Sequence, residues 1–131
     1  MYQDPTGRPR FLSLTAFKFP FNAKLSILHR ITGVALLISL IGYLALLHLI
    51  LLHPVVTLES VSQHCIIKCL SSVFWITLAF HWLSGLKHLL AEHFTQNNAY
   101  KIINSHFAGY FMIVIWLLVS VAILFYFWGV S

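Results

Sequence analysis

Three long stretches of the sequence contain no charged side chain. They are residues 31–58, 69–86 and 102–131. Most of their residues are aliphatic or aromatic. A helix needs about 20 mostly apolar residues to cross the hydrocarbon core of a bilayer. The sequence therefore predicts three membrane spans, at about residues 31–52, 66–86 and 107–129.

The composition excludes a soluble globular domain. Hydrophobic residues make up 60% of the chain and charged residues 8%, and the mean hydropathy is +0.87. Soluble domains average about 25% charged residues. Backbone groups find no hydrogen-bond partners in lipid, so each span must be a helix or a strand of a closed barrel. The apolar runs lack the alternation of barrel strands. We therefore predict an all-α integral membrane protein with three transmembrane helices.

The polar and apolar parts of the chain divide it into two segments. Residues 1–22 are expected to form an N-terminal segment, and residues 23–131 a three-helix membrane domain. Asn22 follows a proline and is a suitable N-cap, so we expect the first helix to begin at Ala23. The connections between the spans, at residues 53–65 and 93–106, are expected to be loops.

Basic residues are unequally distributed over the two sides of the membrane. Those on one side are Arg8, Arg10, Lys18, Lys24, Arg30, Lys87 and Lys101, against Lys68 alone on the other. The positive-inside rule then predicts a cytoplasmic N-terminus and an external C-terminus. The polar N-terminal residues do not resemble a signal peptide. We expect a bacterial inner membrane rather than a mitochondrial one.

Neither the net charge nor the cysteines indicate a further function. The charge is +5, but the basic residues flank the spans and do not cluster with aromatic residues, so nucleic-acid binding is not expected. Cys65 and Cys69 are one helical turn apart, which is awkward for a disulfide. Further ligands for zinc or an iron–sulfur cluster are lacking. Both cysteines are expected to pack as small apolar residues.

A first polar group precedes the first span and consists of Ser26, His29 and Arg30. Ser26 and Arg30 are four residues apart and share a helix face. A hydroxyl and a guanidinium there can both donate hydrogen bonds to a lipid-soluble ligand, and an arginine stabilises an oxyanion such as a quinone develops on reduction. The alternative is that Arg30 only meets lipid phosphates.

A second polar group lies in the second span. His81, Ser84, Gly85, His88 and Glu92 follow one another along a single helical stripe. An imidazole at that depth is suited to bind haem iron, and a glycine lets a flat ring or another helix approach closely. The alternative is a histidine that hydrogen-bonds across a helix interface.

The other polar residues do not indicate catalysis. No nucleophile–base pair, phosphate loop or paired carboxylate is visible, so we expect no catalytic residues. The tryptophans Trp75, Trp82 and Trp116 are expected to pack or to face lipid. Five histidines are expected to be interfacial or solvated: His48, His53, His64, His93 and His106.

Two ordered motifs make the chain resemble a known family, the larger cytochrome b membrane-anchor subunit of succinate dehydrogenase. Residues 26–34, Ser-Ile-Leu-His-Arg-Ile-Thr-Gly-Val, match the family's first signature. Residues 81–89, His-Trp-Leu-Ser-Gly-Leu-Lys-His-Leu, resemble its second. The N-terminal Arg8-Pro9, Leu12-Ser13-Leu14 and Phe19-Pro20 are also similar. Two positions depart from the family pattern, because Lys87 and Glu92 stand where arginine and aspartate are usual.

The resemblance implies a set of cofactors, ligands and partners. His81 matches the axial ligand of a b-type haem, and the smaller anchor subunit provides the second ligand. His29 and Arg30 match residues near the haem propionates, and Ser26, Ile27 and Arg30 match the ubiquinone site. Flavoprotein and iron–sulfur subunits are expected to dock on the cytoplasmic side and to pass electrons from succinate to ubiquinone.

Three alternatives remain open from the sequence. One is the anchor subunit of a fumarate reductase, which runs the reaction in reverse. A second is a small transport subunit, for which the third span offers almost no polar residue. A third is an assembly protein without a cofactor. The favoured hypothesis is a non-catalytic membrane-anchor subunit of succinate dehydrogenase.

Overall fold

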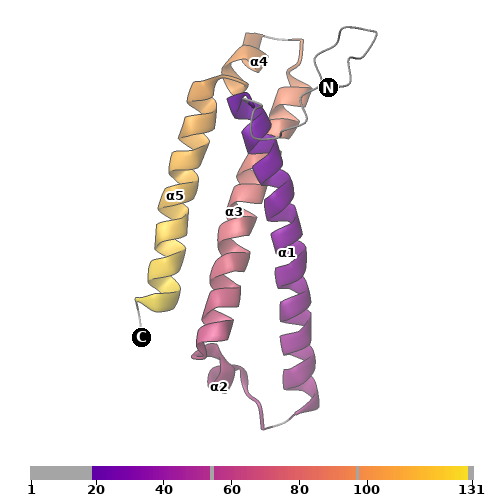
Figure 1. Ribbon diagram of the computed structural model, residues 1–131, viewed down its shortest axis with the longest axis vertical. Helices are drawn as coiled ribbons and strands as arrows, with labels where there is room; N and C mark the ends of the chain where they lie inside the picture. The colour runs from indigo at the N-terminus through magenta and orange to yellow at the C-terminus, as the bar shows by residue number, and fades with distance from the viewer. Residues whose placement is uncertain (1–18, 54, 97, 130–131) are drawn as a thin grey trace, which may run out of the picture.

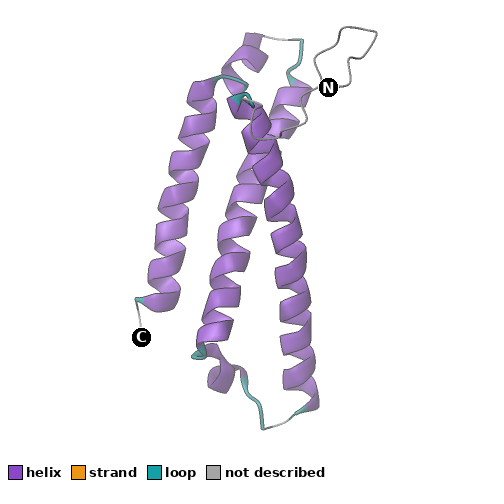
Figure 2. Ribbon diagram, in the orientation of Figure 1, coloured by secondary structure: helices purple, strands orange, loops and turns teal. Residues whose placement is uncertain are grey.

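The computed structural model describes residues 19–53, 55–96 and 98–129. Over these residues the chain forms helices and loops and no strand, as predicted (Figure 2). The three long helices are α1 (Phe21–Leu52), α3 (Cys65–His93) and α5 (His106–Trp128). Each is long and apolar enough to cross a membrane, which confirms the three predicted transmembrane helices. Sequence-based expectations for Arg8, Arg10, Lys18 and residues 12–14 lie outside the described residues.

Both connections between the long helices contain a short helix that the sequence analysis placed in loops. These are α2 (Leu58–Ser62) and α4 (Asn98–Ile103). A capping box begins α2: the Thr57 hydroxyl accepts the amide proton of Ser60, and the Ser60 hydroxyl accepts that of Thr57. The signature was missed because the fourth residue of such a box is more often glutamate or glutamine.

The first helix begins at Phe21, and the prediction of Asn22 as its N-cap was wrong. Pro20 occupies the N-cap position, and its carbonyl accepts the amide protons of Ala23 and Lys24. The Asn22 amide makes tertiary contacts instead: its Nδ2 donates to the Asn104 carbonyl at 3.0 Å. The Asn22 side chain therefore joins the start of α1 to the segment before α5 and does not cap a helix.

Helix α3 lies between the other two long helices and contacts both extensively, whereas α1 and α5 touch only near one end. In Figure 1, α1 and α3 cross near the end that carries α4 and diverge toward α2. Gly109 permits the contact of α5 with the start of α1, because a Cβ there would collide with the Phe21 ring. The bundle is therefore tightest at the α4 end.

Few side chains are buried inside the bundle. The buried apolar cluster consists of Leu25, Phe80 and Met112, with Trp116 packed against it. Several small polar side chains are also buried between the helices: Thr32, Ser39, Ser71, Ser72, Ser84 and Ser120. Small residues at helix interfaces are typical of membrane proteins because they let the backbones approach. Most of the large apolar side chains are exposed and suited to lipid or to partner subunits.

Two surface expectations have different outcomes. Trp75 and Trp82 are exposed, whereas the Trp116 indole donates to the Ile76 carbonyl at 3.0 Å, so the predicted mixture of packing and lipid-facing roles is confirmed. Cys65 and Cys69 are both exposed. The expectation that they pack was wrong, because the first turns of α3 present this face away from the other helices.

Candidate functional site

The antiparallel packing of α1 against α3 brings together the two histidines that the sequence analysis selected as cofactor residues. His29 lies near the start of α1, and His81 lies in the second half of α3. Their imidazole rings stack, with 3.9 Å between the ring centroids and 13° between the ring planes. Both residues are half-buried. Helix packing thus joins two motifs that are about 50 residues apart in the chain.

The hydrogen bonds of His81 determine which of its ring nitrogens carries the proton. Its Nδ1 lies 3.1 Å from the backbone carbonyl oxygen of His29. A carbonyl only accepts hydrogen bonds, so Nδ1 is the protonated nitrogen and Nε2 keeps its lone pair. The Thr32 hydroxyl donates to the same carbonyl at 2.8 Å and lies 3.4 Å from Nδ1. Histidines that bind metals commonly have such a carbonyl partner on their other nitrogen.

Ser84 fixes the second histidine in the same way. The Ser84 hydroxyl is 2.7 Å from Nδ1 of His29 and donates its single proton to the carbonyl of its own helix at Phe80, also at 2.7 Å. With the hydroxyl proton on the Phe80 carbonyl, the Ser84 oxygen accepts from Nδ1 of His29. Ser84 is almost fully buried. Both imidazoles are consequently held by Nδ1 with Nε2 available to a ligand.

A glycine on each helix makes room for the histidine of the other. A Cβ at Gly33 would lie 3.1 Å from Cε1 of His81, and a Cβ at Gly85 would lie 3.4 Å from Cε1 of His29. The first distance is tighter than ordinary van der Waals contact, and the second is ordinary. Gly33 thus allows close approach at His81. The sequence analysis had assigned this kind of role to Gly85.

An open cleft of about 420 Å³ lies beside the paired histidines. It is lined by His29, His81 and His88 together with Trp82, Gly85, Leu86 and Leu89. The ring of His88 stands edge-on to that of His29, with 5.6 Å between centroids. The walls of the cleft are apolar apart from the three imidazoles. The cleft therefore suits a flat, mostly apolar ligand that the histidine nitrogens can bind.

The residues predicted for the quinone site lie next to this cleft but do not line it. Ser26 is half-buried, whereas Ile27 and Arg30 are exposed. All three are on the turn of α1 that precedes or adjoins His29. The structure therefore places them at the same end of the bundle as the histidines, with the Arg30 guanidinium on the surface.

Lys87 and Asn22 form a link that the sequence analysis did not identify. Nζ of Lys87 donates to Oδ1 of Asn22 at 3.0 Å, and Nδ2 of Asn22 donates to the Asn104 carbonyl. This link joins α3, the start of α1 and the segment before α5. The spacing of Asn22, Ser26 and His29 on one helical face was a signal for it, but the partners come from distant parts of the chain.

The remaining histidines and potential ligands form no further centre. His48, His53, His64, His93 and His106 are exposed, as expected. Among the described residues, no group of three or more histidines, cysteines or carboxylates is placed to hold a metal ion. His81 and its surroundings are therefore the candidate site that this chain offers.

Comparison with known protein families shows which family this chain belongs to. The family described as the succinate dehydrogenase/fumarate reductase transmembrane subunit matches residues 4–119. The chain belongs to this family. The match includes both histidine motifs, all of α1 and α3 and much of α5. The resemblance stated above is thereby confirmed, while no curated protein matches the sequence.

Membership explains the exposed apolar surface. This transmembrane subunit associates with other subunits of the succinate dehydrogenase/fumarate reductase complex and is a multi-pass membrane protein. Its exposed face along α1 and α3 is available to lipid and to those subunits. The paired histidines lie toward the end of the bundle where α1 and α3 cross.

Proposed function

We propose that this chain is a membrane-anchor subunit of succinate dehydrogenase that holds a b-type haem and forms part of the ubiquinone site. The observation that carries the proposal is the hydrogen bond from Nδ1 of His81 to the His29 carbonyl. It leaves Nε2 of His81 as a neutral nitrogen donor beside an apolar cleft. An axial ligand to haem iron has this state.

The residues of this cleft fit half of a haem site. His81 would be one axial ligand, and a histidine of the smaller anchor subunit would be the other. His29 and Arg30 would lie near the haem propionates, and the Arg30 guanidinium would donate hydrogen bonds to them. When bound, the haem supplies a one-electron carrier close to the quinone. The chain's own residues orient it, and the apolar walls exclude water from one side.

The quinone role rests on the donors of the adjacent turn of α1. The Ser26 hydroxyl and the Arg30 guanidinium are hydrogen-bond donors for a quinone carbonyl oxygen, which gains negative charge on reduction. Ile27 offers an apolar contact to the ring. These residues bind and orient ubiquinone, and this chain contributes no catalytic residue.

The basic residues support an orientation for this subunit. Lys24, Arg30, Lys87 and Lys101 lie toward the α4 end of the described bundle, whereas Lys68 lies toward the α2 end (Figure 1). The positive-inside rule places the α4 end in the cytoplasm. The flavoprotein and iron–sulfur subunits would dock there, and the bacterial inner membrane is the proposed location.

The test uses the complete complex purified with its flavoprotein, iron–sulfur and smaller anchor subunits. A reduced-minus-oxidised spectrum should contain a b-type haem band in proportion to this chain. Succinate-driven quinone reduction should be faster than quinol-driven fumarate reduction. An assembled complex without the haem band would contradict the haem site, and the opposite ratio of rates would favour the fumarate reductase alternative.

A further inference from the structure

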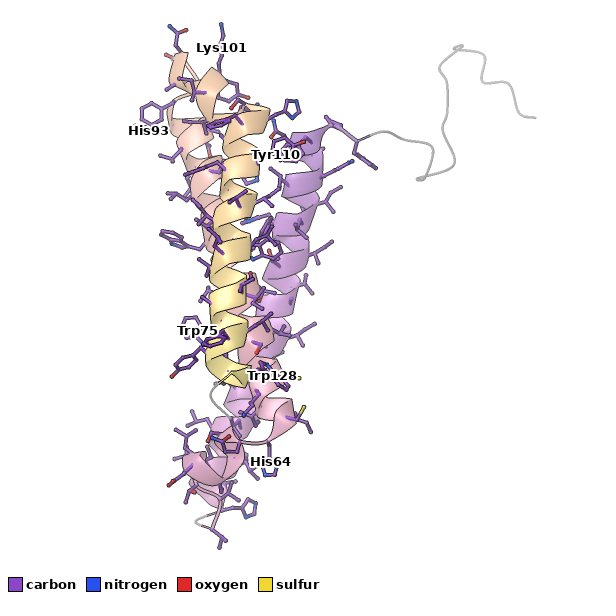
Figure 3. All side chains as sticks on the ribbon, turned by 90° about the vertical axis from the view of Figure 1, so that its left-hand side faces the viewer. His64, Trp75, His93, Lys101, Tyr110 and Trp128 are labelled. Atoms are coloured by element: carbon purple, nitrogen blue, oxygen red, sulfur yellow. The ribbon has the colours of Figure 1, made fainter. Side chains whose placement is uncertain are left out.

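Two cysteines form a pair of thiols on the surface of the bundle, at the end opposite the paired histidines. Cys65 is the first residue of α3, and Cys69 follows one turn later. Both are free and exposed, and their thiols lie within hydrogen-bonding reach of each other. Figure 3 shows His64, the residue before Cys65, at the end of the bundle away from Lys101. The function proposed above does not use these thiols.

The helix holds the two thiols at a spacing that suits one bridging atom better than a direct bond. Residues four apart on a helix have Cβ atoms about 5–6 Å apart. A disulfide requires Cβ atoms about 3.5–4.5 Å apart, so closing one would distort the first turns of α3. A metal ion whose bonds to sulfur are about 2.3 Å long, as for zinc, holds two sulfur atoms as much as about 4.6 Å apart. The pair is therefore better arranged for a bridging metal ion than for a disulfide.

The number of ligands selects the kind of ion. Structural zinc sites and iron–sulfur clusters use four protein ligands. Over the described part of the chain, no group of three or more histidines, cysteines or carboxylates is placed to hold a metal ion. Monovalent copper is a soft ion that prefers thiolates, and two of them complete its linear coordination. Two neighbouring thiols without a third ligand thus favour Cu(I).

The start of a helix also stabilises the charge of such a complex. Two thiolates and one Cu(I) together carry one net negative charge. The N-terminus of a helix has a partial positive charge, which stabilises anions near its first turn. Cys65 lies in the first turn of α3 and Cys69 directly follows it, and this turn contains no acidic residue. The local charges therefore favour the complex over the two free thiols.

We propose that Cys65 and Cys69 form a two-coordinate binding site for Cu(I) at the α2 end of the bundle. Each thiol loses its proton, and each sulfur forms one bond to the ion. Binding therefore releases two protons and leaves the oxidation states of copper and sulfur unchanged. The site uses none of the residues proposed for the haem and the quinone, so it can be tested independently of them.

Alkylation of the complete purified complex tests this site. The chain contains two cysteines in all, so the intact mass of this subunit reports on both. The complex is treated anaerobically with N-ethylmaleimide, with or without Cu(I) held at a low free concentration by bathocuproine disulfonate. The free thiolate is the nucleophile, so Cu(I) should slow alkylation of this subunit on the order of ten-fold. Zn(II) at the same free concentration should not slow it.

Variants separate a two-thiol site from binding to single cysteines. Cys65→Ser and Cys69→Ser each leave one thiol, which Cu(I) should no longer protect. The matched control combines Cys65→Ser with Val55→Cys. It keeps two exposed thiols but not on one helix face, because Val55 lies before α2 and is 91% exposed.

The outcomes decide the proposal in both directions. Protection of the wild-type subunit alone, with two sulfur neighbours in X-ray absorption at the copper edge, would support it. Equal alkylation of the wild-type subunit with and without Cu(I) would overturn it, and this comparison needs no variant to assemble. Protection of a single-cysteine variant, protection of the matched control or equal protection by Zn(II) would also overturn it.

Discussion

The backbone carbonyl of His29 accepts the Nδ1 proton of His81 at 3.1 Å, and the two imidazole rings stack on each other. One helix thus sets the tautomer of the histidine on the other. Because the acceptor is a main-chain atom near the start of α1, any shift of α1 along α3 breaks the bond. The tautomer of His81 therefore depends on the register of α1 against α3.

His81→Leu should remove the proposed haem ligand of this chain. The bis-histidine signature in electron paramagnetic resonance should disappear, because a leucine cannot bind iron. Part of the haem should remain, since the ligand from the other subunit is unchanged. His93→Leu is the control, because His93 is exposed in the last turn of the same helix. An unchanged signature in His81→Leu would show that His81 is not a ligand.

Gly33→Ala should alter the haem spectrum, whereas Gly42→Ala should not. A Cβ at Gly33 meets the His81 ring at 3.1 Å, and a Cβ at Gly42 meets the end of the Leu70 side chain at 3.0 Å. Alanine raises helix propensity by about 1 kcal/mol at either position. The leucine can change rotamer, but the ring is held by its hydrogen bond. We expect a shifted midpoint potential for Gly33→Ala only, and equal potentials would contradict the close packing.

Ser26→Ala should lower quinone reduction on the order of 100-fold while the complex stays assembled, because one hydrogen bond to the developing oxyanion is lost. Succinate oxidation with an artificial dye should be unchanged. Ser39→Ala is the matched control, since the Ser39 hydroxyl donates to the carbonyl of its own helix at Ala35. A parallel loss in the dye and quinone assays would indicate an assembly defect and remove support for the site.

Lys87→Met should destabilise the subunit without removing the haem ligand. The variant leaves Oδ1 of Asn22 without its charged donor and removes one link between the start of α1 and α3. A hydrogen bond to a charged group contributes about 1.5–3 kcal/mol, so the thermal midpoint of the purified complex should fall. Lys101→Met, at an exposed position of α4, is the control. Equal midpoints for both variants would contradict the link.

The predicted topology is tested with reporter fusions. A fusion after residue 131 should report an external C-terminus, and a fusion at residue 97 should report the cytoplasm. The reason is the excess of basic residues toward the α4 end. The opposite pattern would reverse the orientation and would place the proposed quinone site on the wrong side for the iron–sulfur subunit.

The three long helices could be predicted because the length and hydropathy of a segment depend only on its own residues. The uncharged stretches form most of α1, α3 and α5, and α1 begins at Phe21, two residues before the predicted start at Ala23. The short helices α2 and α4 were missed since each has too few residues to show a period. The start of α1 was misplaced because Asn22 serves a tertiary contact.

The sequence by itself determined the membrane class, the three helices, the two histidine motifs and the residue types of the candidate site. The tertiary structure alone decided the partners of these residues: the carbonyl that faces His81, the serine that faces His29, the glycine that admits the His81 ring and the asparagine that binds Lys87. The physical reason is that spacing along one helix specifies a face, whereas a contact between faces depends on the rotation and register of two helices, which packing of their small side chains sets.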